Sequence, residues 1–460
     1  MIAFIFLIPS SNQITKTIMK YLFKTFSLFI FCITCTSCAQ GKKPLTPHEV
    51  TAFIHVNVLT MHDSIPLMDQ TVIVKDDVIA EIGPSSTVQI PKNALTIDGD
   101  YQKYLTPGLV DTHVHLHRSK VKEWITYFVS NGVTTVFNLK GNKKTLALRE
   151  DVKNRQLLGP DIYTSGPFIG TNSKRLDKVT KKGMEKEVLS QKRAGYDMIK
   201  IHGDMTLEVY QHLMSFSRQE GMHVMGHIPR NLTFQDAIDV KQLSLAHAEE
   251  MIYTQFSELN TEEIAPYAKQ AGEMEMWLAP TMTAFNTLSQ SWGDPTVIDA
   301  VMELPETKGL HPYIQKVYRQ DWYGSRDIGS RDYFQRANTF HKPLVTSMYR
   351  SGVQLLLGTD TPMPAVPPGI SLHNEIDLML SLGMTPYETL KMGTYNAGVY
   401  VSTHIDKQAK FGQVKEGYRA NLLLLSSNPL KDMTILRNPE GVMLAGGWYE
   451  HKALKDMITW

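Results

Sequence analysis

The sequence predicts an α/β protein: a (β/α)8, TIM-like barrel with a small β-sandwich domain built from both ends of the chain. Two observations predict this fold. Short apolar runs recur between residues 107 and 407 with helical intervals between them, which is typical of successive βα units. Short β-rich runs separated by turns occupy residues 46–106 and return over residues 408–460, so we expect the two ends to pair.

The apolar runs are the expected barrel strands, and their number, eight, is the number of strands in such a barrel. They are Leu109–His115, Val133–Phe137, Asp161–Thr164, Met198–Ile201, His223–Met225, Leu243–Ala246, Trp277–Pro280 and Val353–Leu357. Thr385-Pro386-Tyr387-Glu388 is a capping box with proline at the first helical position, and it predicts a helix that closes the barrel. Residues 286–340 are longer than one βα loop needs, so we expect a helical insertion over the barrel mouth there.

The net charge of the chain limits the kinds of molecule that it is expected to bind. The 460 residues include 47 basic and 46 acidic side chains, for a formal net charge of +1. A nearly neutral chain creates no field that favours nucleic acid or an anionic membrane surface. We therefore expect a small-molecule substrate and no nucleic-acid partner, while a homo-oligomer remains open.

The N-terminus carries an expected export signal over residues 1–38. A basic segment that begins at Met19 precedes the apolar run Phe26–Ile33, and small residues follow. Met19 is therefore the expected true start. The apolar run is too short for a membrane-spanning helix, which needs about 20 residues. The alternative is a buried N-terminal helix, although no polar face interrupts the run.

The cysteines of the chain lie together in this segment, at Cys32, Cys35 and Cys38. Any metal in the folded body must therefore take nitrogen and oxygen ligands. Thr36-Ser37-Cys38-Ala39-Gln40 resembles a bacterial lipobox, although Cys35 stands where an aliphatic residue is usual. We expect an exported protein that is periplasmic or lipid-anchored in the bacterial cell envelope through Cys38, with no other membrane contact.

The first barrel strand ends in Asp111-Thr112-His113-Val114-His115. Strand side chains alternate between faces, so His113 and His115 point the same way. The C-terminal ends of barrel strands form the active-site mouth, where two imidazoles suit a metal ion. An isolated pair of this kind also occurs on ordinary polar surfaces, so the interpretation depends on the other strands.

Other strand ends carry matching polar residues. In chain order the set is His113, His115, Lys200, His227, His247 and Asp360. A single histidine at a strand end is more often packed or solvated than a ligand, but six such residues at one mouth indicate a shared site. His223 lies deeper along its strand, which favours barrel filling, and His117 is expected in a loop.

These motifs resemble the metal-dependent amidohydrolase superfamily, specifically its imidazolonepropionase-like and Xaa-Pro dipeptidase-like branch. The resemblance runs from about residue 50 to the end of the chain. Asn421 stands where the last of the motifs usually has aspartate. The matching segments are Pro107–His115, Gly195–Ile201, Ser244–His247, Leu357–Thr361 and Phe411–Leu422.

The resemblance implies two divalent metal ions, usually zinc. His113, His115 and Asp360 would hold one ion, and His227 and His247 the other. Lys200, carboxylated to a carbamate, would bridge the two ions, because an ordinary lysine is a cation and cannot be a ligand. The alternative is that Lys200 only lines the barrel or forms a salt bridge.

The implied activity is hydrolysis of a carbon–nitrogen bond by a metal-bound hydroxide, with Asp360 as the catalytic proton shuttle. The expected substrates are dipeptides or N-acyl amino acids. A cyclic amide, as in imidazolonepropionase-like enzymes, and a non-catalytic barrel that only binds are the alternatives. His202 and Arg230 are candidate substrate-binding residues for a carboxylate; otherwise His202 supports a ligand by a hydrogen bond and Arg230 is solvated.

Overall fold

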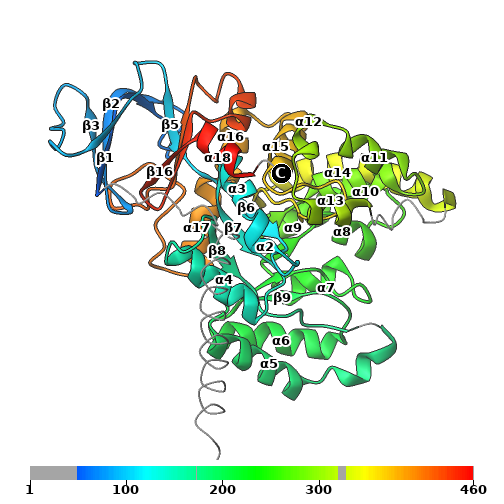
Figure 1. Cartoon of the computed structure of the whole chain (residues 1–460). Coiled ribbons are helices and arrows are strands. Elements are labelled where there is room, and N and C mark those ends of the chain that lie inside the picture. Colours follow the sequence, from blue (N-terminus) through cyan, green and yellow to red (C-terminus); the bar gives the residue numbers. More distant parts are fainter. Residues whose placement is uncertain (1–48, 172, 320–327, 459–460) are drawn as a thin grey trace, which may run out of the picture. The chain divides into compact units, whose positions relative to one another are not determined.

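The computed structural model of the protein describes residues 49–171, 173–319 and 328–458. The predicted signal peptide and lipobox lie outside these residues. No helix within the described ranges combines the length and apolar character needed to cross a bilayer. Figure 1 shows the course of the chain.

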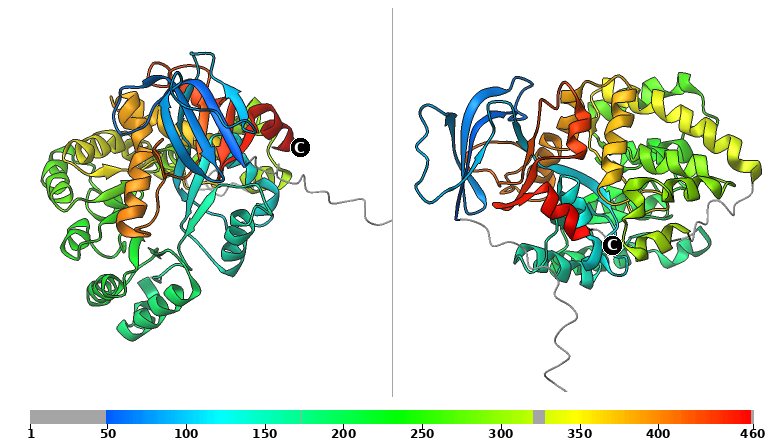
Figure 2. Two further views of the ribbon diagram at one scale, coloured as in Figure 1. Left: turned by 90° about the vertical axis from the view of Figure 1, so that its left-hand side faces the viewer. Right: turned by 45° about the horizontal axis from the view of Figure 1, so that its top comes forward.

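One sheet contains strands from both ends of the described chain. Its order is β16-β15-β14-β5-β1-β2-β3, and β4 pairs with β1. The two ends join where β14 runs antiparallel to β5, with Leu424 opposite Leu105; Figure 2 shows the N-terminal strands, in blue, beside the C-terminal strands, in red. The bounds are β1 Val50–Val58, β2 Leu67–Lys75, β3 Val78–Pro84, β4 Leu95–Asp98, β5 Tyr104–Pro107, β14 Leu422–Leu425, β15 Gly441–Leu444 and β16 Gly447–Glu450.

Two strands of this sheet that are distant in its order nevertheless meet through their side chains. The rings of Phe53 on β1 and Trp448 on β16 lie edge to face with their centroids 5.4 Å apart. Three strands, β15, β14 and β5, separate them in the order of the sheet. The sheet is therefore not flat between β1 and β16.

The other strands are parallel and fall in two groups, ordered β6-β7-β8 and β9-β10-β11-β12-β13. Isolated parallel bridges, Ser165 with Met198 and Val114 with Thr361, connect the two groups at both edges. Each predicted barrel run overlaps one of these strands, and β7 and β10 extend one residue beyond the predicted runs. Their bounds are β6 Leu109–Val114, β7 Val133–Asn138, β8 Asp161–Thr164, β9 Met198–Ile201, β10 His223–Gly226, β11 Ser244–Ala246, β12 Trp277–Ala279 and β13 Gln354–Leu355.

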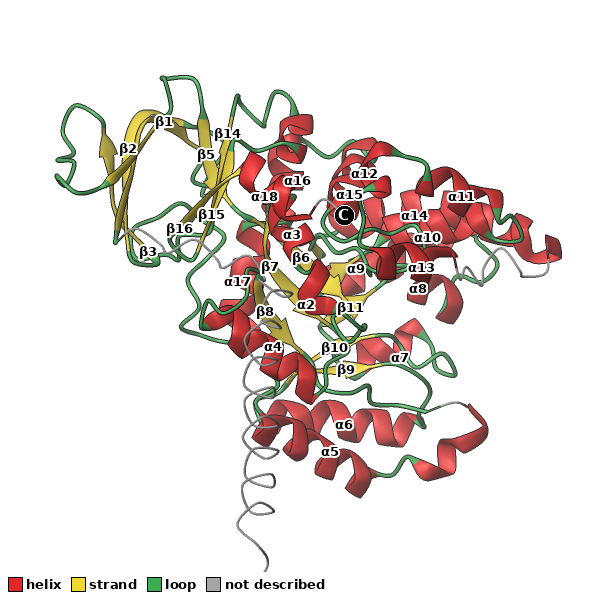
Figure 3. Cartoon of the chain, in the orientation of Figure 1, coloured by secondary structure: helices red, strands yellow, loops and turns green. Residues whose placement is uncertain are grey.

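Helices cover these strands, which explains their apolar sequences. Every residue of β6, β7 and β9 is buried, as expected for parallel strands with both faces covered. Helix α4 contacts β8, α5 contacts β9 and α6 contacts β10 (Figure 3). The predicted capping box at Thr385 is confirmed, because its side chain accepts a hydrogen bond from the backbone N–H of Glu388 at the start of α16.

The helices fill the intervals between the strands and dominate residues 282–350. Their bounds are α2 Val121–Trp124, α3 Thr126–Ser130, α4 Lys143–Lys153, α5 Lys181–Ala194, α6 Leu207–Gln219, α7 Phe234–Asp239, α8 Glu249–Thr254, α9 Ile264–Glu273, α10 Met282–Ser291, α11 Thr296–Met302, α12 Pro305–Lys308, α13 Pro312–Arg319, α14 Arg331–Arg350, α15 Ile370–Ser381, α16 Pro386–Met392, α17 Tyr395–His404 and α18 His451–Ile458, with short 3₁₀ helices at Ser173–Lys178, Thr261–Glu263, Ile328–Ser330 and Met433–Arg437.

Asn421 departs from the aspartate of the resembled motif, and its contacts explain the change. Its side-chain amide donates to Asp161 Oδ2 at 2.8 Å, and its oxygen accepts from the backbone N–H of Ala445 at 2.8 Å. An aspartate there would face the Asp161 carboxylate without a proton to donate. Asparagine at residue 421 therefore fits this neighbour.

Candidate active site

All the strand-end residues predicted from the sequence line one cavity of about 620 Å³. His113 lies in β6 and Lys200 in β9, His115, His227 and His247 directly follow a parallel strand, and Asp360 lies five residues past the end of β13. The carboxyl ends of these strands therefore bring their side chains together. The described lining is His113, His115, His117, Arg118, Lys140, Phe168, Lys200, His202, His227, Arg230, His247, Glu249, Tyr253, Leu288, Trp292, Phe334, Asp360, Met363 and Pro364.

Asp360 lies against the two histidines of the first strand. Its Oδ1 is 3.2 Å from His113 Nε2 and 2.7 Å from His115 Nε2. His113, His247 and Asp360 each offer a ligand atom, and these atoms lie within 4.8 Å of one another. Burial acts to raise the pKa of Asp360, but the hydrogen bond with His115 and the interactions with His115, His247 and Lys200 outweigh it and lower that pKa below its usual value. The carboxylate form suits both metal binding and proton acceptance.

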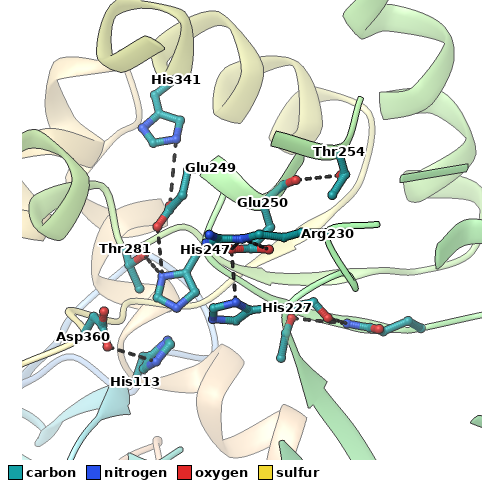
Figure 4. A network of polar contacts seen from close by, with 12 residues as sticks. His113, His227, Arg230, His247, Glu249, Glu250, Thr254, Thr281, His341 and Asp360 are labelled. Carbon is teal, nitrogen blue, oxygen red and sulfur yellow. Dashed lines mark hydrogen bonds and ion pairs between the residues drawn. The ribbon is translucent and has the colours of Figure 1, made fainter. Parts of the chain in front are cut away.

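Two further histidines are held by their Nδ1 atoms. His227 Nδ1 lies 3.1 Å from Glu250 Oε1, and His247 Nδ1 lies 2.8 Å from Thr281 Oγ1 (Figure 4). A partner at Nδ1 fixes the ring and leaves Nε2 as the nitrogen available to a metal. Glu249 Oε1 also lies 3.3 Å from His247 Nδ1, and its other oxygen is 4.0 Å from Nε2 of the buried His341.

Lys200 is the lysine of the predicted site, and its side chain has no hydrogen-bond partner among the residues that the structure describes. The residue is 1% exposed, and its Nζ is among the buried polar atoms without a partner. Burial lowers the pKa of the Lys200 ammonium to about 8. A fraction of the amine is therefore neutral and nucleophilic near neutral pH.

His202 and Arg230 also line the cavity, but both already have neighbours. The His202 ring stacks on Phe168, with centroids 4.5 Å apart and planes 3° from parallel. Arg230 donates to the fully buried carboxylate of Glu250 at 2.7 Å and lies over the Tyr253 ring at 4.7 Å. Glu250 therefore joins Arg230 to His227, which sequence reasoning missed.

Two histidines that the sequence placed outside the site have different positions. His117 lies in a turn after β6, yet it lines the cavity. His223 hydrogen-bonds Ser244 Oγ at 2.7 Å and packs against Tyr400, away from the cavity lining. The adjacent pair Glu249-Glu250, which begins two residues after His247, was the available sequence signal for the carboxylates that support the histidines.

The backbone at the mouth adopts a conformation that side chains rarely take. His247, Thr281 and Asp360 have φ angles of 76°, 49° and 63°. Left-handed non-glycine residues carry strain, and they concentrate at functional sites. The surrounding structure therefore holds these residues in place at the cavity.

Comparison with known proteins identifies the family of the chain. The profile described as "Amidohydrolase family" matches residues 104–448. An ochratoxinase of Aspergillus niger is 22% identical over 457 residues, which cover 90% of this chain and 90% of the relative.

Solved structures share the fold. A putative prolidase from Bifidobacterium longum superposes with a TM-score of 0.64 at 22% identity, covering 89% of this chain and 99% of that one. A Xaa-Pro dipeptidase with bound methionine superposes with a TM-score of 0.65 at 18% identity, and the match covers 87% of this chain and 100% of the dipeptidase chain. The fold is thus the mixed α/β, TIM-barrel type of the amidohydrolases. The family profile matches most of the chain, and a candidate metal site lies at the mouth. The chain therefore belongs to the amidohydrolase family, and it is a hydrolase that acts on carbon–nitrogen bonds of small molecules.

Proposed function

We propose that the cavity hydrolyses the amide bond of a dipeptide-like or N-acyl substrate with two divalent metal ions, most plausibly zinc. The observation that supports this most directly is Lys200, whose buried Nζ lacks a partner in a cavity lined by four ligand-type histidines and Asp360. An uncharged amine can react with carbon dioxide to form an anionic carbamate. Carboxylated in this way, with loss of a proton, Lys200 would supply an anionic oxygen ligand to the metal site.

The proposed ligand sets follow the strands. His113, His115 and Asp360 would hold one ion, and His227 and His247 would hold the other, since all five line the cavity. The imidazole and carboxylate donors suit zinc. Bound there, the ions would supply Lewis acidity to the substrate carbonyl and lower the pKa of water.

Asp360 is the proposed proton shuttle. Its lowered pKa leaves it ionised at neutral pH, so it can accept the proton of the attacking water. The same carboxyl then returns the proton to the leaving nitrogen. Its position beside His113 and His115 places this transfer next to the proposed ions.

The remaining lining shapes the substrate site. His202 and Arg230 border it, and Arg230 also orients His227 through Glu250. The apolar side chains Leu288, Trp292, Phe334 and Met363 offer contacts to an apolar acyl group. The cavity volume of about 620 Å³ is in the range of small-molecule sites.

We also propose that the eight parallel strands close into one barrel, over residues 107–407. The two isolated bridges and the hydrogen bond from Thr112 N–H to Leu357 C=O at 2.9 Å support closure. The sheet of both chain ends, over residues 46–106 and 408–460, is proposed to fold into a sandwich. In a flat sheet β1 and β16 would lie roughly 19 Å apart, so the contact of Phe53 with Trp448 supports folding over.

Export remains a proposal from the sequence: a signal peptide up to Cys38, followed by a periplasmic or lipid-anchored enzyme of the bacterial cell envelope. Mass spectrometry of the mature N-terminus tests it. A lipid on Cys38 is expected, and an unmodified N-terminus downstream of Cys38 would contradict the anchor.

The test of function is a screen of purified protein against dipeptides, N-acyl amino acids and lactams, with elemental analysis of the same sample. We expect turnover of the first two classes and close to two divalent ions per chain. Turnover restricted to lactams would overturn the substrate class. One ion per fully active chain would remove the bridging role of Lys200.

A further inference from the structure

The cations of the cavity divide into paired and unpaired groups. Arg230 is neutralised by the buried carboxylate of Glu250, and Lys200 belongs to the proposed metal bridge. Arg118 and Lys140 also line the cavity. Within the described ranges, neither makes an ion pair with a carboxylate, so this part of the lining has positive charge without a counter-charge.

Lys140 lies just after β7, at the mouth end of that strand. Its ammonium lies 4.8 Å from the centroid of the Phe168 ring, a contact of the cation with an aromatic face. Partial burial lowers the pKa of Lys140, the charge of Arg118 lowers it further, and the carboxylate of Asp360 acts in the opposite direction. Lys140, Arg118 and Asp360, the proposed proton shuttle, all line this cavity.

Arg118 lies in the turn after β6, three residues beyond His115. The Nε atom of Arg118 is buried and has no hydrogen-bond partner in the described part of the chain. A buried guanidinium donor without an acceptor is costly unless a ligand satisfies it.

We propose that Arg118 and Lys140 form the subsite for a free carboxylate of the substrate. This inference rests on the proposed function. The guanidinium fork binds one or both carboxylate oxygens, and the lysine adds a second charge. In an α-amino acid leaving group, one carbon separates the nitrogen from the carboxylate. Arg118, Lys140 and Asp360 line the same cavity, which fits a substrate whose leaving nitrogen meets Asp360 while its α-carboxylate meets the cations.

The test uses two probes that differ only in that carboxylate, N-benzoyl-L-phenylalanine and N-benzoyl-phenethylamine. The metal-loaded wild-type protein should prefer the first by about 100-fold in kcat/KM, as expected for charge-assisted hydrogen bonds. The double variant Arg118→Met and Lys140→Met should lose this preference through a higher KM for the first probe. Its kcat/KM for the second probe should change by less than about 3-fold.

Three variants serve as comparisons. Lys143→Met removes an exposed positive charge from the start of α4, outside the cavity lining, and should leave the preference intact. Lys140→Arg keeps the charge and should retain most of the preference. Arg230→Met tests the competing location: if it abolishes the preference while the double variant keeps it, the carboxylate binds at Arg230 and the proposal is wrong. Equal loss on both probes, at unchanged metal content, would also overturn it.

The outcome separates this subsite from the proposed function. If the wild-type protein hydrolyses neither probe, the proposed amide hydrolysis fails for this substrate class. Titration calorimetry then tests the carboxylate subsite separately. L-phenylalanine should bind about 10- to 100-fold more weakly to the double variant than to wild type, while the affinity for phenethylamine should be unchanged. Equal binding of L-phenylalanine to both proteins would refute the subsite.

Discussion

Glu250 offers a sharp test of how the site is held together. Its fully buried carboxylate accepts from Arg230 at 2.7 Å and lies 3.1 Å from His227 Nδ1. Glu250→Gln keeps the size of the side chain and one acceptor oxygen, but it removes the charge. We expect weaker metal binding, since His227 loses the partner that orients its ring and raises its basicity.

The magnitude follows from these contacts. Loss of a carboxylate partner of a metal-binding histidine typically costs 10- to 100-fold in affinity, or about 1.4–2.7 kcal/mol. Breaking a fully buried ion pair costs about 3–5 kcal/mol in stability. The Arg230 side chain is 54% exposed, so solvent screens its lost partner, and we expect only about 1–2 kcal/mol.

The assay is metal content after dialysis against graded concentrations of a chelator, together with urea unfolding. Glu273→Gln is the matched control, because Glu273 is 64% exposed and pairs loosely with Lys269 at 3.8 Å. The control should behave as wild type. If Glu250→Gln retains wild-type metal affinity, Glu250 does not position His227, and the proposed ligand role of His227 loses its support.

Four other changes probe different parts of the molecule. Asp360→Asn should lower kcat by about 10²–10⁴-fold with a smaller change in KM at matched metal content, and near-normal kcat would place the proton shuttle elsewhere. Lys200→Ala should abolish turnover with partial rescue by small carboxylic acids, whereas wild-type activity in this variant would end the carbamate hypothesis. Asn421→Asp should lower stability by about 1–3 kcal/mol at neutral pH, measured by unfolding, because two carboxylates would meet at Asp161. Burial raises the pKa of Glu375 from 4.5 to about 8, so the folded protein holds a proton that the unfolded chain releases. The contribution of Glu375 to the free energy of unfolding should be full below about pH 4.5 and fall by several kcal/mol as pH rises to about 8. If the difference in free energy of unfolding between wild type and Glu375→Gln does not change with pH, this reasoning is wrong.

The strand-end pattern predicted which residues meet. Parallel strands bring their carboxyl ends to one edge, so residues as distant as His113 and Asp360 could be assigned to one site without any knowledge of side-chain positions. The same reasoning located each barrel strand, because a buried parallel strand needs a continuous apolar run.

The contacts that support the site could not be predicted in this way. Glu250 lies at the start of α8 and contacts His227, which follows a different strand. This contact depends on the direction in which α8 leaves β11. His117 and Arg118 reach the cavity through the conformation of a turn, which no periodicity describes. Loop conformation and side-chain partners are set by tertiary packing, which a single sequence does not display.

The pairing of β5 with β14 has a consequence for how the chain folds. The partner of Leu105, Leu424, is synthesised about 320 residues later. Closing so long a loop costs about 5 kcal/mol of free energy before the contact contributes. Until then β5 keeps an open hydrogen-bonding edge, which is a template for pairing with other chains. We expect slow completion of this sheet during synthesis, and aggregation of any chain that ends before residue 422.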